Sequence, residues 1–525
     1  MADHAVASRP STASPAAVPG LPMWMSLRTF IIFVAGLTLL RVGGLIATPL
    51  GLHPDEAQYW AWSRTLDWGY FSKPPLVAWA IAATTALFGN EAWAVRLAAP
   101  LAHAGAAAAL FALGRRLYGP AAGWWAGVSW LLIPGVWLSS ALITTDALLL
   151  PLWSAALLAA WRWQETRDLR WALATGALVG LGSLAKYAML YFPLCLALAA
   201  LLSAPARRAV LSWQGAAATG VAALVLAPNV YWNATHDFET VAHTAANADW
   251  GGDLLNVDQL GAFLGDQVAI AGVMAILLAM AAWRLWRGQS AFDDRARFLL
   301  AFVAPPLLVI VGQALISRAH GNWAAAAYPA TIVLVAGAFA QGRALMRANV
   351  IHAALFAIFL ALALAPAAAY RAPLLGRAIE NGLKRMNAWP ETAALVAARA
   401  RAAAAEGRPY TAVLVDHRHA YNEFAYHWRD MPDLPPLRMY VLRDAAGNQA
   451  EAEAPMTGAV DGRVLVVHMS PRYEPFVAGD FRTFATTERT EVPLGPRKTR
   501  ALAFSDASGF DPAPRTPEFL ARVGE

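Results

Sequence analysis

Residues 52–62 read "LHPDEAQYWAW" and place two adjacent carboxylates, Asp55 and Glu56, just after a strongly apolar segment. That segment, near residues 26–48, is long enough to cross a bilayer, which takes about 20 apolar residues. Ionisable groups this close to hydrocarbon are costly and usually functional. The aromatic residues that follow have helical spacing, so we expect a helix that lies along the membrane surface.

The composition of the whole chain indicates a polytopic membrane protein. Of its 525 residues, 58% are hydrophobic and 14% are charged, and the mean hydropathy is +0.42. Average globular proteins carry about 25% charged residues. The net charge of +6 does not indicate nucleic-acid binding, because the arginines gather at the ends of apolar segments. The single cysteine, Cys195, lies in an apolar run, so disulfides do not support this fold.

Apolar runs separated by breakers predict about eleven transmembrane spans. They lie near residues 26–48, 93–114, 121–142, 146–163, 171–186, 188–203, 211–232, 263–283, 298–316, 323–341 and 350–369. The segments 171–186 and 188–203 are short and crowded, which leaves the count open by one or two.

Basic residues in the short loops predict the orientation, because Lys and Arg gather on the cytoplasmic side. Arginine clusters fall in alternate loops, on the same side as Arg28. They are Arg115, Arg116, Arg162, Arg167, Arg170, Arg207, Arg208, Arg284, Arg287, Arg295, Arg297, Arg343 and Arg347. We therefore expect residues 1–22, rich in Ala, Ser and Pro, to be a disordered cytoplasmic tail, and the first apolar segment to be a retained span. The loop 49–92 and everything after about residue 370 should lie outside the cytoplasm.

Residues 371–525, at the C-terminus, have the sequence pattern of a soluble α/β unit and not that of membrane spans. Residues 391–407, "ETAALVAARARAAAAEG", predict a surface helix that ends at Gly407. Residues 410–416 and 462–470 are β-branched runs bounded by turn residues, as in the strands of a small α/β unit. The predicted fold is therefore an all-α transmembrane domain, residues 23–370, with interfacial helices in its first outer loop and a small extracytoplasmic α/β domain at its C-terminus.

Polar residues at the predicted outer face are candidates for a functional site. Beside Asp55 and Glu56, Tyr59 and Trp60 suit the membrane interface, where amphipathic rings settle. Lys73 precedes a proline pair that opens a second apolar helix, so its ammonium is a plausible fixed phosphate ligand. The alternatives are a solvated or helix-capping carboxylate at Asp55 and a lysine that reaches along the interface at Lys73.

Other polar residues lie near the ends of later spans. Asp146 is a lone acid that could cap its helix or bind a substrate or metal. Arg318, His320 and Lys186 place positive charge on the outer side, where topology disfavours it, and this favours binding of a substrate phosphate. His236 and Asp237, in the loop 234–262 together with His243, are compatible with a metal, although a solvated loop explains them as well.

These motifs resemble the C-type-superfold glycosyltransferases that use lipid-linked sugars. The similarity is to the protein mannosyltransferase and bacterial aminoarabinose–lipid A transferase-like families, which are family 39-like. It covers roughly residues 25–370 and does not extend to the C-terminal domain. It rests mainly on residues 53–79, "HPDEAQYWAWSRTLDWGYFSKPPLVAW", and also on "TTDALLLPLW", "GLGSLAKY" and "HGNWAAAAYP".

The resemblance implies roles for these residues. Asp55 would take the proton from the acceptor hydroxyl or orient it, Glu56 would assist binding, and Lys73 would hold the leaving phosphate. Asp146 would line the site or help to bind a metal. Members of the family differ in whether they need a divalent metal, so that requirement stays open, and no other cofactor is implied.

The expected activity is transfer of a sugar from a polyprenyl-phosphate donor, such as undecaprenyl phosphate, to a periplasmic acceptor. The acceptor would be lipid A, another envelope glycan or a protein, and the enzyme would lie in the bacterial inner membrane. A single carboxylate base with a phosphate leaving group favours inversion at the sugar carbon. The alternatives are a transporter or flippase, which should carry ionisable residues at mid-span, and an envelope scaffold.

Overall fold

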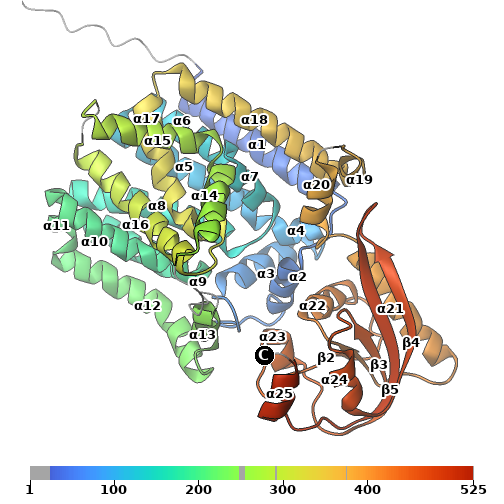
Figure 1. Cartoon of the computed structure of the whole chain (residues 1–525). Helices are drawn as coiled ribbons and strands as arrows, with labels where there is room; N and C mark the ends of the chain where they lie inside the picture. Colours follow the sequence, from blue (N-terminus) through green and yellow to red (C-terminus); the bar gives the residue numbers. More distant parts are fainter. Residues whose placement is uncertain (1–23, 247–254, 290–291, 374, 524–525) are drawn as a thin grey trace, which may run out of the picture.

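The computed structural model describes residues 24–246, 255–289, 292–373 and 375–523 (Figure 1). The predicted tail, residues 1–22, and part of the loop 234–262 lie outside the described residues. A large helical unit is followed by a smaller C-terminal unit that contains the strands.

The helices of the first unit are α1 (Leu27–Ala47), α2 (Pro54–Trp62), α3 (Leu76–Phe88), α4 (Ala92–Arg96), α5 (Ala98–Tyr118), α6 (Pro120–Leu132), α7 (Pro134–Ala141), α8 (Thr145–Thr166), α9 (Leu169–Ala185), η1 (Tyr187–Leu190), α10 (Tyr191–Leu202), α11 (Ala204–Val210), α12 (Trp213–Thr235), α13 (Glu239–Ala246), α14 (Val257–Ala271), α15 (Val273–Trp286), α16 (Asp294–Ile316), η2 (Gly321–Ala327), α17 (Tyr328–Phe339), α18 (Arg343–Leu364), α19 (Pro366–Tyr370) and α20 (Gly376–Leu383).

The C-terminal unit contains α21 (Trp389–Ala405), β1 (Ala412–Val415), α22 (Arg418–His427), β2 (Leu437–Met439), α23 (Gln449–Glu453), β3 (Val460–His468), α24 (Glu474–Gly479), β4 (Phe481–Pro493), β5 (Thr499–Phe510) and α25 (Pro517–Val523).

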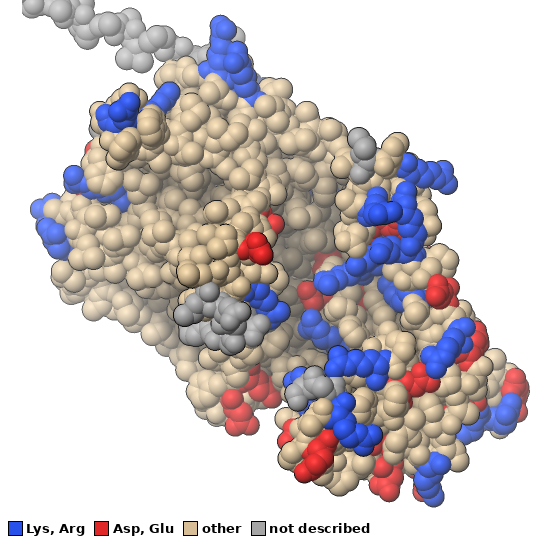
Figure 2. All heavy atoms as spheres, in the orientation of Figure 1, with Lys and Arg blue, Asp and Glu red and all other residues tan. Residues whose placement is uncertain are grey.

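The helical unit has the apolar helices of a multi-pass membrane protein. Among the described residues, six helices are long and apolar enough to cross a membrane, or up to eight if each bent pair is one span. The class of protein is therefore confirmed, whereas the count of about eleven spans stays a prediction. Figure 2 shows few charged side chains over the middle of this unit and many over the C-terminal unit.

Two predicted spans are broken helix pairs. Residues 121–142 form α6 and α7, which meet at 56° where Pro134 begins the second helix. Residues 263–283 form α14 and α15, which meet at 103° at Gly272. Gly272 has a φ of +57°, and a Cβ there would meet the ring of His352. The predicted span at residues 263–283 is therefore a bent helix pair, because a glycine with positive φ turns the chain there.

The basic loops come together at one end of the helical unit. Arg116 pairs with Glu165, and a shallow pocket is lined by Glu165, Arg167, Arg208 and Arg295 from three different loops. The segments that carry Arg116, Arg167, Arg208 and Arg295 therefore meet at one end of the helical unit, as the alternation in the sequence predicts for them. That this end is cytoplasmic stays a prediction.

The loop 49–92 contains the two expected extra helices, α2 and α3. His53 Nδ1 accepts a hydrogen bond from the Asp55 amide at 3.3 Å, and Glu56 Oε2 accepts one from the His53 amide at 2.8 Å. Pro54 occupies the first helical position. This reciprocal cap, together with the proline, begins α2. His53, not Asp55, is therefore the capping residue of this helix.

The aromatic residues of α2 do not face lipid. Tyr59 is 6% exposed and Trp60 is 5% exposed. The Trp60 indole donates to Asn90 Oδ1 at 2.9 Å, and its ring meets Tyr426 of the C-terminal unit edge-on at 5.1 Å. The predicted membrane-interface placement of Tyr59 and Trp60 is therefore wrong, because α2 packs against the C-terminal unit and both rings are buried.

The C-terminal unit is the expected α/β unit. Its five-stranded sheet has the order β2-β1-β3-β5-β4, with β1 parallel to both β2 and β3 and the β3–β5 and β5–β4 pairs antiparallel. Helices α21 and α22 cover one face, where Trp389, Val396 and Phe424 pack on β1. The predicted helix near 391–407 and both predicted strands are confirmed. The long pair β4–β5 was not predicted, because most β4 side chains are polar and exposed.

Candidate active site

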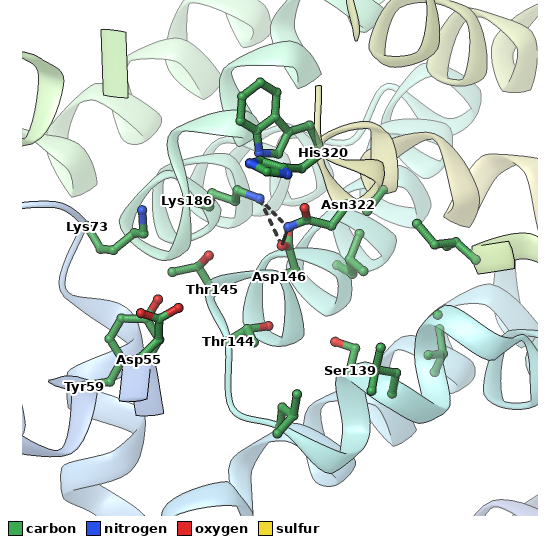
Figure 3. A pocket seen from close by; sticks show the side chains of 18 of the residues that line it. Asp55, Tyr59, Lys73, Ser139, Thr144, Thr145, Asp146, Lys186, His320 and Asn322 are labelled. Atoms are coloured by element: carbon green, nitrogen blue, oxygen red, sulfur yellow. Dashed lines mark hydrogen bonds and ion pairs between the residues drawn. The ribbon is translucent and has the colours of Figure 1, made fainter. Parts of the chain in front are cut away.

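A cavity of about 560 Å³ lies where the ends of several helices meet the C-terminal unit. Its walls come from α2, the segment before α3, α6–α8, Lys186 after α9, α13, α14, η2 and the start of α22. The chain positions of the lining residues run from Asp55 to Arg418. Figure 3 shows Asp55 and Lys73 on one side of this space and Lys186, His320 and Asn322 on another.

Asp55 is the carboxylate of the acidic pair that lines the cavity. Its side chain is 46% exposed, and its nearest ion-pair partners lie at 3.8 Å: His53 Nδ1 and Arg418 Nη2. These separations are longer than hydrogen bonds, so neither partner holds the carboxylate tightly. Asp55 is therefore accessible to a molecule in the cavity.

Glu56 is not among the residues that line the cavity. It is 1% exposed and forms an ion pair with Arg96, whose Nη2 lies 2.7 Å from Glu56 Oε2. Glu56 Oε1 also accepts the Ile143 amide at 2.9 Å, just before α8. The expectation that Glu56 assists substrate binding is corrected accordingly. It holds α2 against α4 and the segment that leads into α8.

Asp146 lies in the first turn of α8 and lines the cavity. It does not cap the helix, because Thr144 Oγ1 accepts the Ala147 amide. Lys186 Nζ donates to both oxygens of Asp146 at 2.8 and 3.0 Å, and Asn322 Nδ2 donates at 2.7 Å (Figure 3). Asp146 therefore fixes an ammonium and an amide at the cavity wall.

This arrangement does not fit a divalent metal at Asp146. A cation would face the Lys186 ammonium, which already occupies both carboxylate oxygens. Among the described residues, no three His, Cys, Asp or Glu side chains gather as a metal site requires. His236 stacks on Trp232 at 4.1 Å, and neither it nor Asp237 lines the cavity. The expectation that His236 and Asp237 line the site is corrected by this placement, whereas metal binding by these two residues stays a prediction.

Lys73 lines the cavity from the segment just before α3, and Pro74 and Pro75 fix the chain there as expected. Burial lowers the pKa of Lys73, the neighbouring Lys186 lowers it further, and Asp55 opposes this shift. The side chain therefore faces the cavity and its charges, and does not extend along a lipid surface.

Arg318 and His320 lie in different surroundings. His320 lines the cavity, with its ring edge-on to Trp323 at 5.1 Å. Arg318 is exposed and is not among the lining residues. The expectation that Arg318 contacts the donor phosphate is corrected, since its side chain lies outside the cavity.

Arg418 is the main functional candidate that sequence reasoning missed. It is the first residue of α22, and besides facing Asp55 its Nη1 donates to Gln58 Oε1 at 3.4 Å. No signal in the chain links it to Asp55, because the two residues are 363 positions apart. The cavity also includes Tyr59, whose pKa is raised by burial and by Asp55.

Comparisons with known proteins agree with this architecture. Residues 72–232 match the dolichyl-phosphate-mannose-protein mannosyltransferase family. The lipid A galacturonosyltransferase RgtD of Rhizobium johnstonii is 40% identical over 313 residues, which cover 59% of this chain and 65% of that relative's length. The chain thus spans slightly less than two thirds of the curated relative that it matches.

Two solved structures share the fold. ArnT from Cupriavidus metallidurans in the apo state superposes with a TM-score of 0.61 at 15% identity, and covers 91% of this chain and 98% of its own. ArnT bound to undecaprenyl phosphate gives the same TM-score at 17% identity, with the same coverage of both chains. The resemblance to C-type-superfold glycosyltransferases is confirmed.

Proposed function

We propose that this chain, which resembles C-type-superfold glycosyltransferases and shares the fold of ArnT, transfers a sugar from a polyprenyl-phosphate donor to a hydroxyl group. The acceptor is lipid A, another envelope glycan or a protein at the periplasmic face of a bacterial inner membrane. One observation carries the proposal. An accessible carboxylate, Asp55, the ammonium groups of Lys73 and Lys186, and the imidazole of His320 line a single cavity although they are distant in sequence.

The charges suit a displacement at the anomeric carbon. The acceptor oxygen forms a bond to that carbon while the bond from carbon to phosphate oxygen breaks. The acceptor proton goes to Asp55, and the electron pair leaves with the polyprenyl phosphate. A base on one side and cations on the other match the charges that develop in this step. One carboxylate base acting in a single displacement gives inversion.

Lys73 and Lys186 have distinct parts in this proposal. Asp146, which also accepts a hydrogen bond from Asn322, holds the Lys186 side chain in one orientation, so that it acts as a fixed counter-charge for the phosphate. Lys73 lies on the same side of the cavity as Asp55 in Figure 3 and would meet the phosphate from the wall opposite Lys186. These residues supply the positive charge themselves, so we propose no step through a metal.

Two findings support the donor and acceptor classes. The solved ArnT structure holds undecaprenyl phosphate, and the relative RgtD is named as a lipid A galacturonosyltransferase. A transporter or flippase finds less support, because the cavity charges gather at helix ends beside the C-terminal unit.

The test is transfer from undecaprenyl-phosphate sugars to lipid A, measured with the purified full chain. We expect Asp55→Asn to lower the transfer rate about 10²–10⁴-fold, as the loss of a general base does. Glu91→Gln is the matched control, because Glu91 is a carboxylate of the same outer loop that does not line the cavity. Full activity of Asp55→Asn, or an equal loss in both variants, would overturn the assigned role.

A further inference from the structure

A second cavity of about 380 Å³ lies among α1, α7, α18 and α20. Its walls are mostly apolar and include Leu45, Trp137, Phe356 and Leu360. It shares Leu138 and Leu142 with the first cavity, so α7 and the residue after it separate the two spaces. The proposed transfer chemistry uses no residue of this second cavity.

Arg41 lines this cavity from inside the transmembrane helix α1. The residue is 5% exposed. Its Nη1 donates to Ser140 Oγ at 3.0 Å, and its Nη2 donates to the Leu131 carbonyl. Its Nε, however, has no hydrogen-bond acceptor among the described residues. The described residues give it no ion-pair partner either, and the Phe356 ring lies 5.6 Å from the guanidinium carbon.

A buried guanidinium with only neutral partners is an incomplete arrangement. Removing a charge from water costs several kcal/mol unless an opposite charge and hydrogen bonds compensate for it. Ionisable residues inside membrane spans are accordingly paired or functional. Arg96 lines the same cavity and shows the complete arrangement, because Glu56 pairs with it at 2.7 Å. Arg41 is similarly buried, with no anionic partner in the part of the chain that the structure describes.

We propose that this cavity binds a phosphorylated lipid, whose phosphate pairs with Arg41 and whose hydrocarbon chain fills the apolar walls. Guanidinium binds phosphate through two parallel hydrogen bonds, and the Nε atom that now lacks an acceptor belongs to that donor set. A volume of 380 Å³ is at the lower end for ligand pockets, so it holds part of a chain and not a whole lipid.

The place of Arg41 along α1 suits a lipid phosphate. It precedes Ala47, the last residue of the helix, by six positions, or about 9 Å along the axis. Arg41 therefore lies within the span and nearer to its predicted outer end, Ala47, than to its other end, Leu27. A lipid bound here would rest against α7, whose opposite side contacts the first cavity.

The experiment measures lipid binding to the purified full chain and does not depend on transfer. Protein stripped of lipid in detergent is titrated with phosphatidylglycerol, undecaprenyl phosphate or uncharged diacylglycerol, and bound lipid is counted by native mass spectrometry. We expect an anionic lipid to bind more tightly than diacylglycerol. Arg41→Gln should weaken that binding about tenfold to a hundredfold, the loss expected for a charged hydrogen-bond partner.

Two pairs of variants, each with a matched control, test whether the lipid binds in this cavity. Arg28→Gln removes an exposed arginine from the same helix and should bind as the wild type does. Ala363→Phe fills the cavity from α18 without changing Arg41 and should also lose the lipid, whereas Ala361→Phe, exposed on the same helix, should not. The cavity-filling pair keeps the test valid if Arg41→Gln fails to fold.

The two anionic probes distinguish the source of the lipid. A loss confined to phosphatidylglycerol identifies a membrane phospholipid, and a loss confined to undecaprenyl phosphate identifies a polyprenyl lipid. Either result supports the site. Equal binding of anionic and uncharged lipids by the wild type, or unchanged anionic binding in both Arg41→Gln and Ala363→Phe, overturns it. Because no sugar is transferred, a failure here leaves the proposed enzyme activity untouched.

Discussion

The two faces of helix α2 give neighbouring carboxylates opposite surroundings. Asp55 is half-exposed at the cavity, and its nearest ion-pair partners are 3.8 Å away. Glu56 is buried, with Arg96 at 2.7 Å and two backbone amides on its oxygens. The difference teaches that the conspicuous acidic pair has two separable roles: Glu56 builds the helix junction that presents Asp55.

The sharpest test of this comparison is whether Glu56→Gln lowers stability while Asp55→Asn lowers activity. Glu56→Gln leaves the Arg96 charge buried and unpaired, so we expect it to lower the free energy of unfolding by about 3–5 kcal/mol. Asp55→Asn should leave that free energy nearly unchanged while abolishing most of the transfer. Denaturation of the full chain in detergent micelles measures the first quantity.

The control for Glu56 is an exposed ion pair. Glu165 pairs with Arg116, and both side chains are more than one third exposed. Glu165→Gln should therefore change the free energy of unfolding by less than about 1 kcal/mol. If Glu56→Gln were as stable as this control and inactive, Glu56 would belong to the chemistry and the comparison would break.

Like Asp55, Lys73 should affect activity and not stability, because it is proposed to bind the donor phosphate. We expect Lys73→Met to lower kcat/KM about tenfold to a hundredfold, since a charged hydrogen bond to the phosphate is lost. The free energy of unfolding should hardly change, because Lys73 is not part of the Glu56 network. Steady-state kinetics with varied donor concentration measure the effect.

The pH profile provides an independent check on Lys73. Its pKa is lowered by burial and by Lys186, and only the protonated ammonium pairs with a phosphate. As pH rises through that lowered pKa, kcat/KM should fall, at a pH below the ordinary lysine range. In kcat the fall should come at higher pH, because bound phosphate stabilises the ammonium. An active Lys73→Arg variant that kept the same alkaline fall would contradict this assignment.

Arg418 should give the smallest effect. Its contact with Asp55 is 3.8 Å long and more than one third exposed, a geometry usually worth less than about 1 kcal/mol. We expect Arg418→Gln to lower kcat/KM about two- to fivefold. The control is Arg429→Gln. Arg429 lies two residues after α22 and pairs with Glu91, outside the cavity. A loss as large as that of Asp55→Asn would mean that Arg418 contacts substrate.

Several parts of the fold followed from local chemistry. The apolar segments, the cap at His53, the proline pair before α3 and the glycine that ends α21 are each encoded within a few residues. The break at Gly272 was missed because apolar composition continues through it, and only the His352 ring beside it explains why no side chain fits. Likewise Trp60 has the sequence features of an interface residue, and only the docked Tyr426 shows that it is buried.

The candidate site was predicted in part. Topology placed Asp55, Lys73, Asp146, Lys186 and His320 on one side of the membrane, and all five line the first cavity. It also placed Arg318, His236 and Asp237 on that side, and these do not line it. A shared membrane side restricts only one coordinate of a residue, so it cannot decide which residues converge.

The sequence by itself determined the membrane class, the positions of the apolar segments and the residue types that the proposed chemistry needs. Tertiary structure alone decided which carboxylate of the pair faces the cavity and that Arg418 lies beside it. It also decided that Arg41 is buried with no anion among the described residues around it. The reason is physical. Hydropathy and caps act within one helix, whereas burial and pairing of charge depend on segments that packing alone brings together.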